Sequence, residues 1–323
     1  MTTPLSVGLV GAGWIGSFHA ATLSDRLPGV RLAAVADPVP SPAERLNAPK
    51  VYREPLELLA DPTVDAVAIC SPAATHAELV VAAAIAGKHV FCEKPMALTL
   101  ADADRAIDAA RDAGVALQVG FNRRFAADFA AMHARIVAGE IGTPQLLRSL
   151  TRDPGITEDV AARVKPWTVF NETLIHDFDT LCWLNPGARV TEVYAQADAL
   201  IHPGLKHAGF LDTAVVQLRF DNGALATAEA SFQAAYGYDV RGEVFGSAGV
   251  LLSGRDPHCA ATGNTDLFGD AYVAQFAHFA ACIRTGVQPS VTGHDARVAL
   301  EIALAARESV ETGAPVVLTA VLR

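Results

Sequence analysis

The sequence lacks the features of several protein classes. Only 25 of its 323 residues are Lys or Arg, against 35 Asp and Glu, which gives a formal net charge of −10. The nearest approach to a basic run is the pair Arg123-Arg124. Nucleic-acid-binding proteins normally carry a basic patch, so we expect no nucleic-acid partner.

Cysteine is also scarce. The five cysteines are scattered and none forms a C-x-x-C pair, which predicts neither a disulfide framework nor a zinc site. Three loop histidines have no ligand spacing, and no metal is expected: His202, His207 and His258.

Long apolar runs are absent as well. No stretch approaches the roughly 20 apolar residues of a membrane span. The N-terminus has no basic segment followed by an apolar one, as a secretory signal would. The sequence therefore predicts a cytoplasmic protein with no membrane partner.

What is present suits two folded domains. The chain is about twice the length of an average domain, and 51% of its residues are hydrophobic. Up to about residue 120, short apolar runs alternate with Ala-rich helical segments, a pattern typical of a doubly wound parallel sheet. Between residues 189 and 252, strand-like runs follow one another, and Asn222-Gly223 predicts a hairpin turn.

We therefore predict an α/β fold with two domains, residues 1–121 and 122–323. The first is expected to be a dinucleotide-binding Rossmann domain. The second is expected to be an α+β domain on a mainly antiparallel sheet. Helices expected near 271–285 and 294–312 could pack on either domain.

Gly11, Gly13 and Gly16 form a G-x-G-x-x-G motif that follows an apolar strand and opens a helix. In such a motif the first glycine makes a tight turn, the second lets the backbone approach a pyrophosphate, and the third lets the helix lie close to the strand. The helix N-terminus offers N–H groups to phosphates, which makes Trp14 and Ile15 further candidate contacts.

Asp37 lies at the end of the second expected strand, 21 residues after Gly16. Its carboxylate could accept hydrogen bonds from ribose hydroxyls and would repel a 2′-phosphate, so the sequence predicts NAD in preference to NADP. The competing interpretation is an ordinary glycine turn followed by a solvated aspartate.

Two further motifs carry possible chemistry. Lys94, in Cys92-Glu93-Lys94-Pro95, follows a strand end, where it could hold a substrate hydroxyl or be simply solvated. In residues 170–179, helical spacing predicts Glu172, His176 and Asp179 on one face. A histidine beside a carboxylate can accept a proton near neutral pH, although a surface acid–histidine pair has the same spacing.

Five segments occur in one order: GAGWIG at 11–16, CSPAATH at 70–76, CEKP at 92–95, GFNRRF at 120–125 and IHDFD at 175–179. On these motifs the chain resembles the Gfo/Idh/MocA oxidoreductase family over essentially its whole length. Residues 236–249 look most like the inositol 2-dehydrogenase branch of that family.

The resemblance implies a second domain built on an open sheet. It implies NAD(P)-linked oxidation or reduction of a sugar or polyol, and a homo-oligomer, a tetramer or dimer, assembled through that sheet. It makes His176 the proton acceptor and Lys94 a contact to substrate and cofactor. Glu172 stands where inositol dehydrogenases commonly have aspartate, and the longer side chain could change which polyol is contacted.

The remaining residues are carried over by position. Tyr236 lies where the family often supplies a hydroxyl contact, although Tyr238 could be the one that faces inward. Arg152 and Asp153 could line the substrate pocket. On the cofactor side, the resemblance adds three residues: Ser71, His76 and Glu93.

The first functional hypothesis is therefore an NAD-dependent dehydrogenase of a cyclic polyol or sugar. The same residues could serve a keto-sugar reductase or an NAD-dependent glycoside hydrolase on this scaffold. A non-catalytic nucleotide sensor is a fourth reading, although it would need neither Lys94 nor His176.

Overall fold

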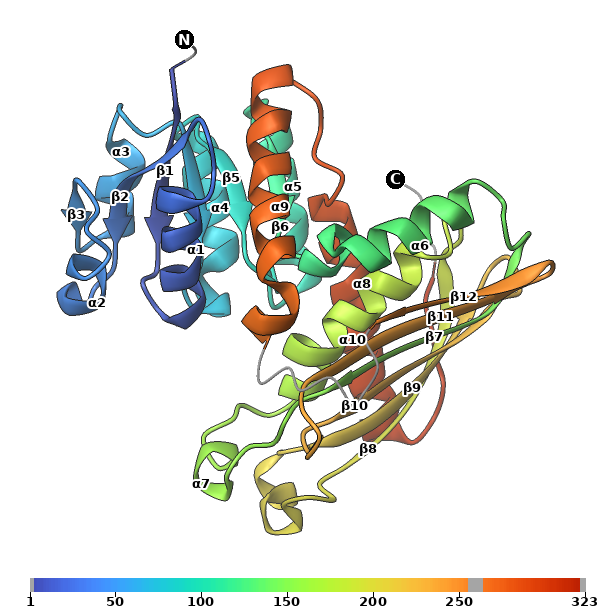
Figure 1. Ribbon diagram of the computed structural model, residues 1–323. Coiled ribbons are helices and arrows are strands. Elements are labelled where there is room, and N and C mark those ends of the chain that lie inside the picture. The colour runs from blue at the N-terminus through green and yellow to red at the C-terminus, as the bar shows by residue number, and fades with distance from the viewer. Residues whose placement is uncertain (1–2, 255–263, 320–323) are drawn as a thin grey trace. The chain divides into compact units, whose positions relative to one another are not determined.

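The computed structural model describes residues 3–254 and 264–319 (Figure 1). His258 and Cys259 lie outside the described residues. The chain divides into two compact units. The first contains Met1–Asn122 and Asp270–Arg297, and the second contains Arg123–Gly269 and Val298–Arg323.

The first unit is built on a parallel six-stranded sheet of order β3-β2-β1-β4-β5-β6, in which every neighbouring pair is parallel. The central strands are buried along their length, as expected where helices cover both faces of a sheet. The predicted doubly wound sheet is confirmed. Its strands are β1 (Leu5–Val10), β2 (Val30–Ala36), β3 (Val51–Tyr52), β4 (Ala66–Ile69), β5 (His89–Cys92) and β6 (Leu117–Val119).

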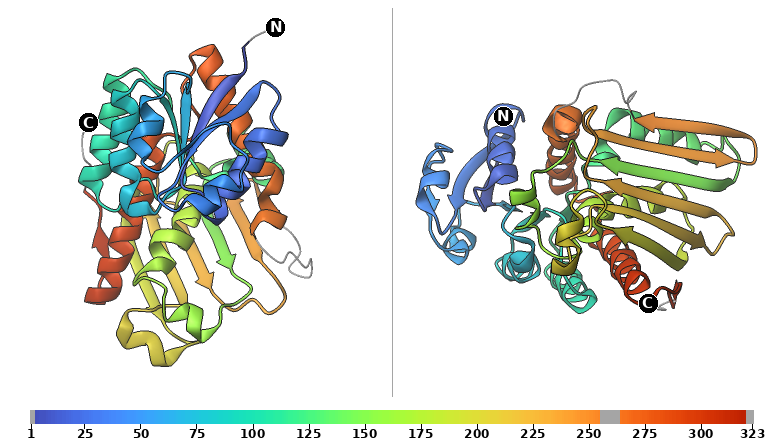
Figure 2. Two further views of the ribbon diagram at one scale, coloured as in Figure 1. Left: turned by 90° about the vertical axis from the view of Figure 1, so that its left-hand side faces the viewer. Right: turned by 90° about the horizontal axis from the view of Figure 1, so that it is seen from below.

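Helices cover this sheet on both sides (Figures 1 and 2). One face carries α1 (Trp14–Asp25) and α9 (Asn264–Thr285), and the other carries α4 (His76–Ile85) and α5 (Leu100–Asp112). Two short helices, α2 (Pro40–Glu44) and α3 (Pro55–Ala60), and the turn η1 (Ala73–Thr75) complete the unit.

Helix α9 returns to the first unit from far along the chain. Its Phe276 and Phe279 are buried in the same core cluster as Leu9 of β1 and Phe91 of β5. The predicted division after residue 121 assigned these residues to the second domain but left open on which domain the last helices pack. In the structure Asp270–Arg297 belong to the first unit, where the two phenylalanines join the apolar core that includes residues of α1.

The second unit is built on a seven-stranded sheet of order β12-β11-β7-β10-β9-β8-β13. Its pairs are antiparallel except for β7 and β10, which run parallel. The predicted hairpin joins β9 to β10, with Gly223 at φ +89°. The strands are β7 (Pro144–Arg152), β8 (Val190–Asp198), β9 (Thr213–Phe220), β10 (Leu225–Ser231), β11 (Asp239–Gly246), β12 (Gly249–Gly254) and β13 (Val316–Val317).

One face of this sheet is covered by helices and the other is open (Figures 1 and 2). The covering helices are α6 (Ala127–Val137), α8 (Ile175–Trp183) and α10 (Gly293–Thr312), the last of which begins in the first unit. Burial alternates along β9 and β12, as in a sheet with one face packed. The open face exposes apolar side chains, among them Leu146, Leu225, Phe245, Val250 and Leu252.

The helix predicted over residues 170–179 is not uniform. Its first part, η3 (Val169–Leu174), is a π-helix, and α8 starts only at Ile175. Three further short helices are η2 (Asn122–Phe125), α7 (Glu158–Ala161) and η4 (Pro203–Ala208).

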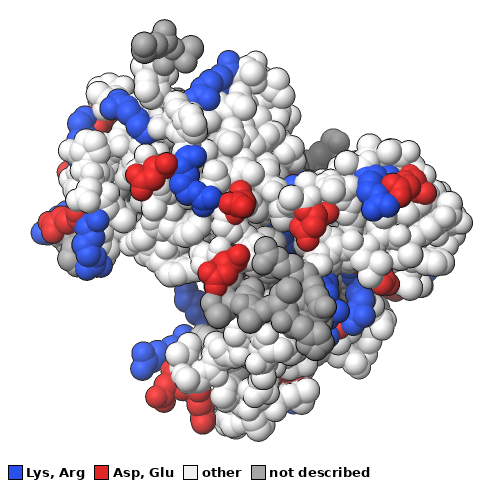
Figure 3. Space-filling model, in the orientation of Figure 1, with Lys and Arg blue, Asp and Glu red and all other residues white. Residues whose placement is uncertain are grey.

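The surface is mixed in charge. On the face drawn in Figure 3, acidic and basic side chains are interspersed over the described surface. Within residues 3–254 and 264–319, no helix combines the length and apolarity needed to cross a bilayer.

Candidate functional site

The glycine motif lies between β1 and α1, and its three glycines differ in what requires them. Gly11 has φ +95°, and a Cβ there would lie 2.6 Å from the Ser71 nitrogen. A Cβ on Gly16 would lie 2.0 Å from the Gly11 oxygen. A Cβ on Gly13 would meet nothing within 4 Å. Gly11 and Gly16 are thus required by local packing, whereas Gly13 faces open space in which a pyrophosphate could approach the backbone.

Helix α1 begins directly at this open space. Its N-cap residue, Gly13, provides no side-chain cap. The first N–H groups of a helix have no partner within the helix, so those of Trp14 and Ile15 are suited to bind phosphate oxygens. Trp14 itself is largely exposed.

Asp37 follows β2, and the backbone fixes the orientation of its carboxylate. Oδ2 accepts a hydrogen bond from the Ala12 N–H at 2.7 Å, and Oδ1 accepts one from the Val39 N–H at 2.8 Å. Each oxygen retains a lone pair for a further donor. Such a carboxylate can bind two neighbouring ribose hydroxyls.

These residues surround one cavity of about 900 Å³, a volume within the usual range of ligand pockets. It lies at the carboxyl ends of β1, β2 and β4, the edge at which doubly wound sheets bind ligands. The structure therefore brings together six of the predicted cofactor residues: Gly11, Gly13, Trp14, Ile15, Asp37 and Ser71.

His76 and Glu93, also predicted to contact the cofactor, are both buried and have hydrogen-bond partners within the first unit. His76 is buried, and its two ring nitrogens lie 2.8 Å from the Pro95 oxygen and 2.7 Å from the Ser71 oxygen. His76 thus braces the loops that follow β4 and β5. Glu93 is buried against His19, with Oε1 and Nε2 2.7 Å apart.

The Glu93–His19 pair connects the cofactor helix with Lys94. His19 belongs to α1, and Glu93 also accepts the Lys94 N–H on Oε2 at 3.2 Å. Burial raises the pKa of Glu93, but the hydrogen bond from His19 and the charges of His19 and Lys94 outweigh it, so the pKa is lowered. His19 and Glu93 are 74 residues apart, so the spacing of residues along α1 does not indicate this partner.

In the second unit, the predicted three-residue face is only partly formed. Glu172 is exposed on η3 and His176 is half-buried in the first turn of α8. Asp179 is instead buried, and its Oδ2 accepts a hydrogen bond from Arg124 Nε at 2.9 Å. Glu172 and His176 thus remain the candidates for contact with a substrate.

The two tyrosines are separated by the structure. Tyr236 is exposed, donates to Asp239 Oδ2 at 2.8 Å and accepts a long hydrogen bond from Arg152. Burial, assisted by the Asp153 carboxylate, raises the pKa of Tyr238 well above its ordinary value. The hydroxyl contact through Tyr236, with Tyr238 as the alternative, stays a prediction.

Near His176, the structure shows an ion pair that the sequence did not predict. Arg123 and Asp177 form a buried ion pair with 2.8 Å between Nη1 and Oδ1. Both lie in motifs noted in the sequence, and a charged residue within an apolar run was the signal that could have identified them.

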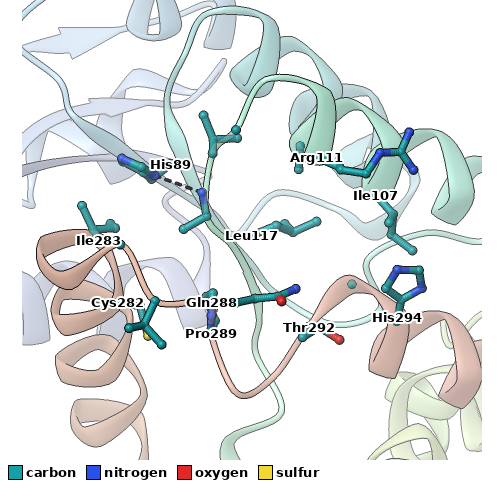
Figure 4. Close-up of a pocket in the computed structure, with 17 residues that line it drawn as sticks. His89, Ile107, Arg111, Leu117, Cys282, Ile283, Gln288, Pro289, Thr292 and His294 are labelled. Carbon is teal, nitrogen blue, oxygen red and sulfur yellow. Dashed lines mark hydrogen bonds between the residues drawn. The ribbon is translucent and has the colours of Figure 1, made fainter.

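A second cavity, of about 420 Å³, lies at the opposite end of the first unit's strands (Figure 4). It is lined by the starts of β5 and β6, the end of α9 and the loop that leads into α10. His89 and Gln288 are among its polar residues. None of the predicted site residues contributes to it.

Comparison with known proteins agrees with this geometry. Residues 5–121 match a family model described as an oxidoreductase family with an NAD-binding Rossmann fold, and residues 129–252 match the GFO/IDH/MocA C-terminal domain. The chain is 38% identical to a myo-inositol 2-dehydrogenase of Thermotoga maritima, with 95% of this chain and 96% of that one covered.

Two further relatives extend the likeness. A scyllo-inositol 2-dehydrogenase (NAD(+)) of Bacillus subtilis is 37% identical, with 95% of this chain and 94% of that one covered. A crystal structure of scyllo-inositol dehydrogenase from Lactobacillus casei, with bound NAD(H) and scyllo-inositol, is 26% identical with a TM-score of 0.91, covering 98% of this chain and 99% of that one. The chain thus belongs to the Gfo/Idh/MocA family of oxidoreductases, with an NAD-binding Rossmann domain at its N-terminus.

Proposed function

We propose that the protein is an NAD-dependent dehydrogenase that oxidises a secondary hydroxyl of an inositol-like cyclic polyol, or of a sugar, to a ketone. The observation that carries the proposal is likeness along nearly the full chain to inositol dehydrogenases, in a chain that also has Lys94 and His176. The reduction of a keto-sugar would use the same residues in the opposite direction.

The cofactor would be held by the first unit. The backbone at Gly11 and Gly13 and the N–H groups that open α1 suit the pyrophosphate. The Asp37 carboxylate suits a ribose with free hydroxyls and disfavours a 2′-phosphate, which supports NAD over NADP. When bound, the nicotinamide ring accepts the hydride that leaves the substrate carbon.

His176 is proposed to accept the hydroxyl proton. An imidazole has an ordinary pKa of about 6.5 and can take up a proton near neutral pH. Its place in the first turn of a helix with buried neighbours limits its movement. Glu172, one turn earlier, is proposed to orient the imidazole or to bind a neighbouring hydroxyl.

Lys94 is proposed to hold the reacting oxygen. Its ammonium group can donate a hydrogen bond to the hydroxyl and favours the negative charge that develops as the proton leaves. Asp153, directly after β7, is proposed as a substrate contact. Tyr236 is proposed to supply a further hydroxyl contact to the substrate, with Tyr238 as the alternative.

We also propose that the open sheet face of the second unit binds further copies of this chain, in a dimer or tetramer. This face exposes Leu225, Phe245 and Leu252 together with the ion pair of Arg148 and Glu229. An apolar surface with interspersed charges suits a self-complementary interface between identical subunits.

The experiment that tests the activity is a substrate panel. Purified protein is mixed with NAD⁺ or NADP⁺ and with inositol isomers, aldoses or anhydrosugars, and absorbance of the reduced nicotinamide is followed. The proposal expects reduction of NAD⁺ by at least one cyclic polyol. Glycoside cleavage without accumulation of NADH would indicate a hydrolase, and cofactor binding without turnover of any substrate would indicate a sensor.

A further inference from the structure

A buried polar network lies directly beside His176. The Asp177 carboxylate accepts hydrogen bonds from Arg123 Nη1 at 2.8 Å, Ser149 Oγ at 2.5 Å and Thr151 Oγ1 at 2.6 Å. Arg123 Nη2 in turn donates to Thr151 Oγ1 at 2.5 Å. All four side chains are at most 2% exposed.

The network joins three segments of the second unit. Arg123 belongs to η2, Ser149 and Thr151 to β7, and Asp177 to the first turn of α8. The neighbouring pair of Arg124 and Asp179 repeats the connection between η2 and α8. The two arginines of GFNRRF thus bind the two aspartates of HDFD, in the same order along the chain.

Stability is a weak explanation for such a network. Removing an arginine and a carboxylate from water is costly, and apolar residues of similar volume often replace a buried ion pair with no loss of stability. What charged, directional hydrogen bonds provide is a defined position. The first turn of α8 is therefore held against β7 in one orientation.

That first turn needs an external constraint. The preceding segment η3 is a π-helix, whose wider turn is rare and is found mostly at functional sites. Hydrogen bonds of the helix alone therefore define the start of α8 less strictly than in a continuous α-helix. Adjacent helical residues point about 100° apart, so Asp177 can bind β7 while His176 is directed elsewhere.

We propose that Asp177, held by Arg123, Ser149 and Thr151, is a positioning residue that sets the location of the His176 imidazole. The inference rests on the proposed role of His176 as proton acceptor. Arg123 and Asp177 act through His176 and need not touch the substrate.

The test uses variants that remove one interaction at a time in the full-length protein. Ser149→Ala and Thr151→Val each delete one donor to Asp177, and Asp177→Asn removes the charge while keeping the shape. Arg135→Ala is the matched control, because it breaks an exposed ion pair between Arg135 on α6 and Glu140 beyond the end of that helix. Turnover with NAD⁺ and polyol, the dissociation constant of NAD and thermal unfolding are measured for each.

We expect kcat to fall in Ser149→Ala and Thr151→Val and to fall furthest in Asp177→Asn, to about tenfold to a hundredfold below wild type. The reason is that small displacements of a reacting group are costly. The dissociation constant of NAD should change little. The isotope effect on kcat with substrate deuterated at the reacting carbon should rise, since the chemical step becomes slower. A merely structural role would lower the unfolding temperature without changing the isotope effect.

The outcomes separate this inference from the proposed function. If wild-type protein oxidises no polyol or sugar, the proposed function fails. If wild type is active but Asp177→Asn and Thr151→Val retain its kcat and isotope effect, the positioning role is overturned. Should Asp177→Asn not fold, the Ser149→Ala and Thr151→Val pair gives the same decision.

Discussion

The two units hold their candidate catalytic side chains in different ways. In the first unit, the buried carboxylate next to Lys94 is Glu93, and its side-chain partner in the described part of the chain is His19. In the second unit, the buried carboxylate next to His176 is Asp177, which has three side-chain donors. In both units, a buried carboxylate is adjacent in sequence to the candidate catalytic residue.

The difference follows from the two sheets. Lys94 leaves the end of a buried parallel strand, whose ladder to β4 and β6 already defines the backbone. His176 lies on a helix that begins directly after the π-helix η3 and covers only one face of a sheet. A strand end needs little additional fixing, whereas a helix start needs side-chain hydrogen bonds to the sheet.

The largest expected effect is loss of turnover in His176→Ala. Removing a general base typically costs about 10²- to 10⁴-fold in rate, and we expect kcat to fall by this amount. Affinity for NAD, measured by fluorescence titration, should stay within about twofold because the cofactor residues belong to the other unit. The control variant is His202→Ala, which removes a loop histidine that contacts the Ile156 oxygen. Loss of NAD affinity in His176→Ala would mean that the residue was misassigned.

A large effect on stability is expected for His19→Ala. The variant takes the side-chain hydrogen-bond partner from the buried Glu93 carboxylate and leaves its charge uncompensated, at a cost of about 3–5 kcal/mol in the free energy of unfolding. Chemical denaturation measures it. The double variant His19→Leu with Glu93→Leu should regain much of that stability, because it leaves no buried charge without a partner. A cost below about 1 kcal/mol for His19→Ala would contradict a buried Glu93 carboxylate that depends on His19.

A smaller effect is expected at the cofactor. Asp37→Ser removes a charged hydrogen-bond acceptor, worth about 1.5–3 kcal/mol, so kcat/KM with NAD should fall about tenfold to a hundredfold. The same parameter with NADP should rise relative to NAD, because the repulsion of a 2′-phosphate is lost. Asp25→Asn, in an exposed residue at the end of α1, should leave both unchanged. An unchanged ratio between the two cofactors would refute the role given to Asp37.

The smallest effect on folding is expected for Leu252→Lys, on the open sheet face. Leu252 is 71% exposed, so the free energy of unfolding of the monomer should change by no more than about 0.5 kcal/mol. The assembled mass from light scattering should nevertheless decrease. Ile85→Lys, at an 81% exposed position on α4, is the control and should leave the mass unchanged. A wild-type chain that is monomeric at all concentrations would contradict the proposed interface.

Local patterns predicted most of the fold. Continuous apolar runs identified the buried parallel strands, and Asn222-Gly223 identified the hairpin, because each depends on a few neighbouring residues. Strand order in the second sheet is different. The insertion of β7 between β10 and β11, parallel to one and antiparallel to the other, depends on contacts far apart in sequence.

The candidate site was predicted in the same uneven way. The glycine motif and Asp37 follow from spacing along one strand–helix–strand segment. The π-helix before His176 was not predicted, because its residues would also fit an α-helix. The partner of Glu93 is 74 residues away, and the donors to Asp177 are 26, 28 and 54 residues away, beyond what spacing along a helix or strand can indicate.

The return of α9 to the first unit has a consequence for synthesis. A ribosome that has translated the whole parallel sheet has not yet made Phe276 and Phe279, which belong to that unit's core. Until those residues emerge, the nascent chain leaves the apolar face beside α1 uncovered while the second sheet is still being added. Folding of the nucleotide-binding unit is therefore completed near the end of translation, and a polypeptide terminated at residue 121 would present that face to chaperones and to other chains.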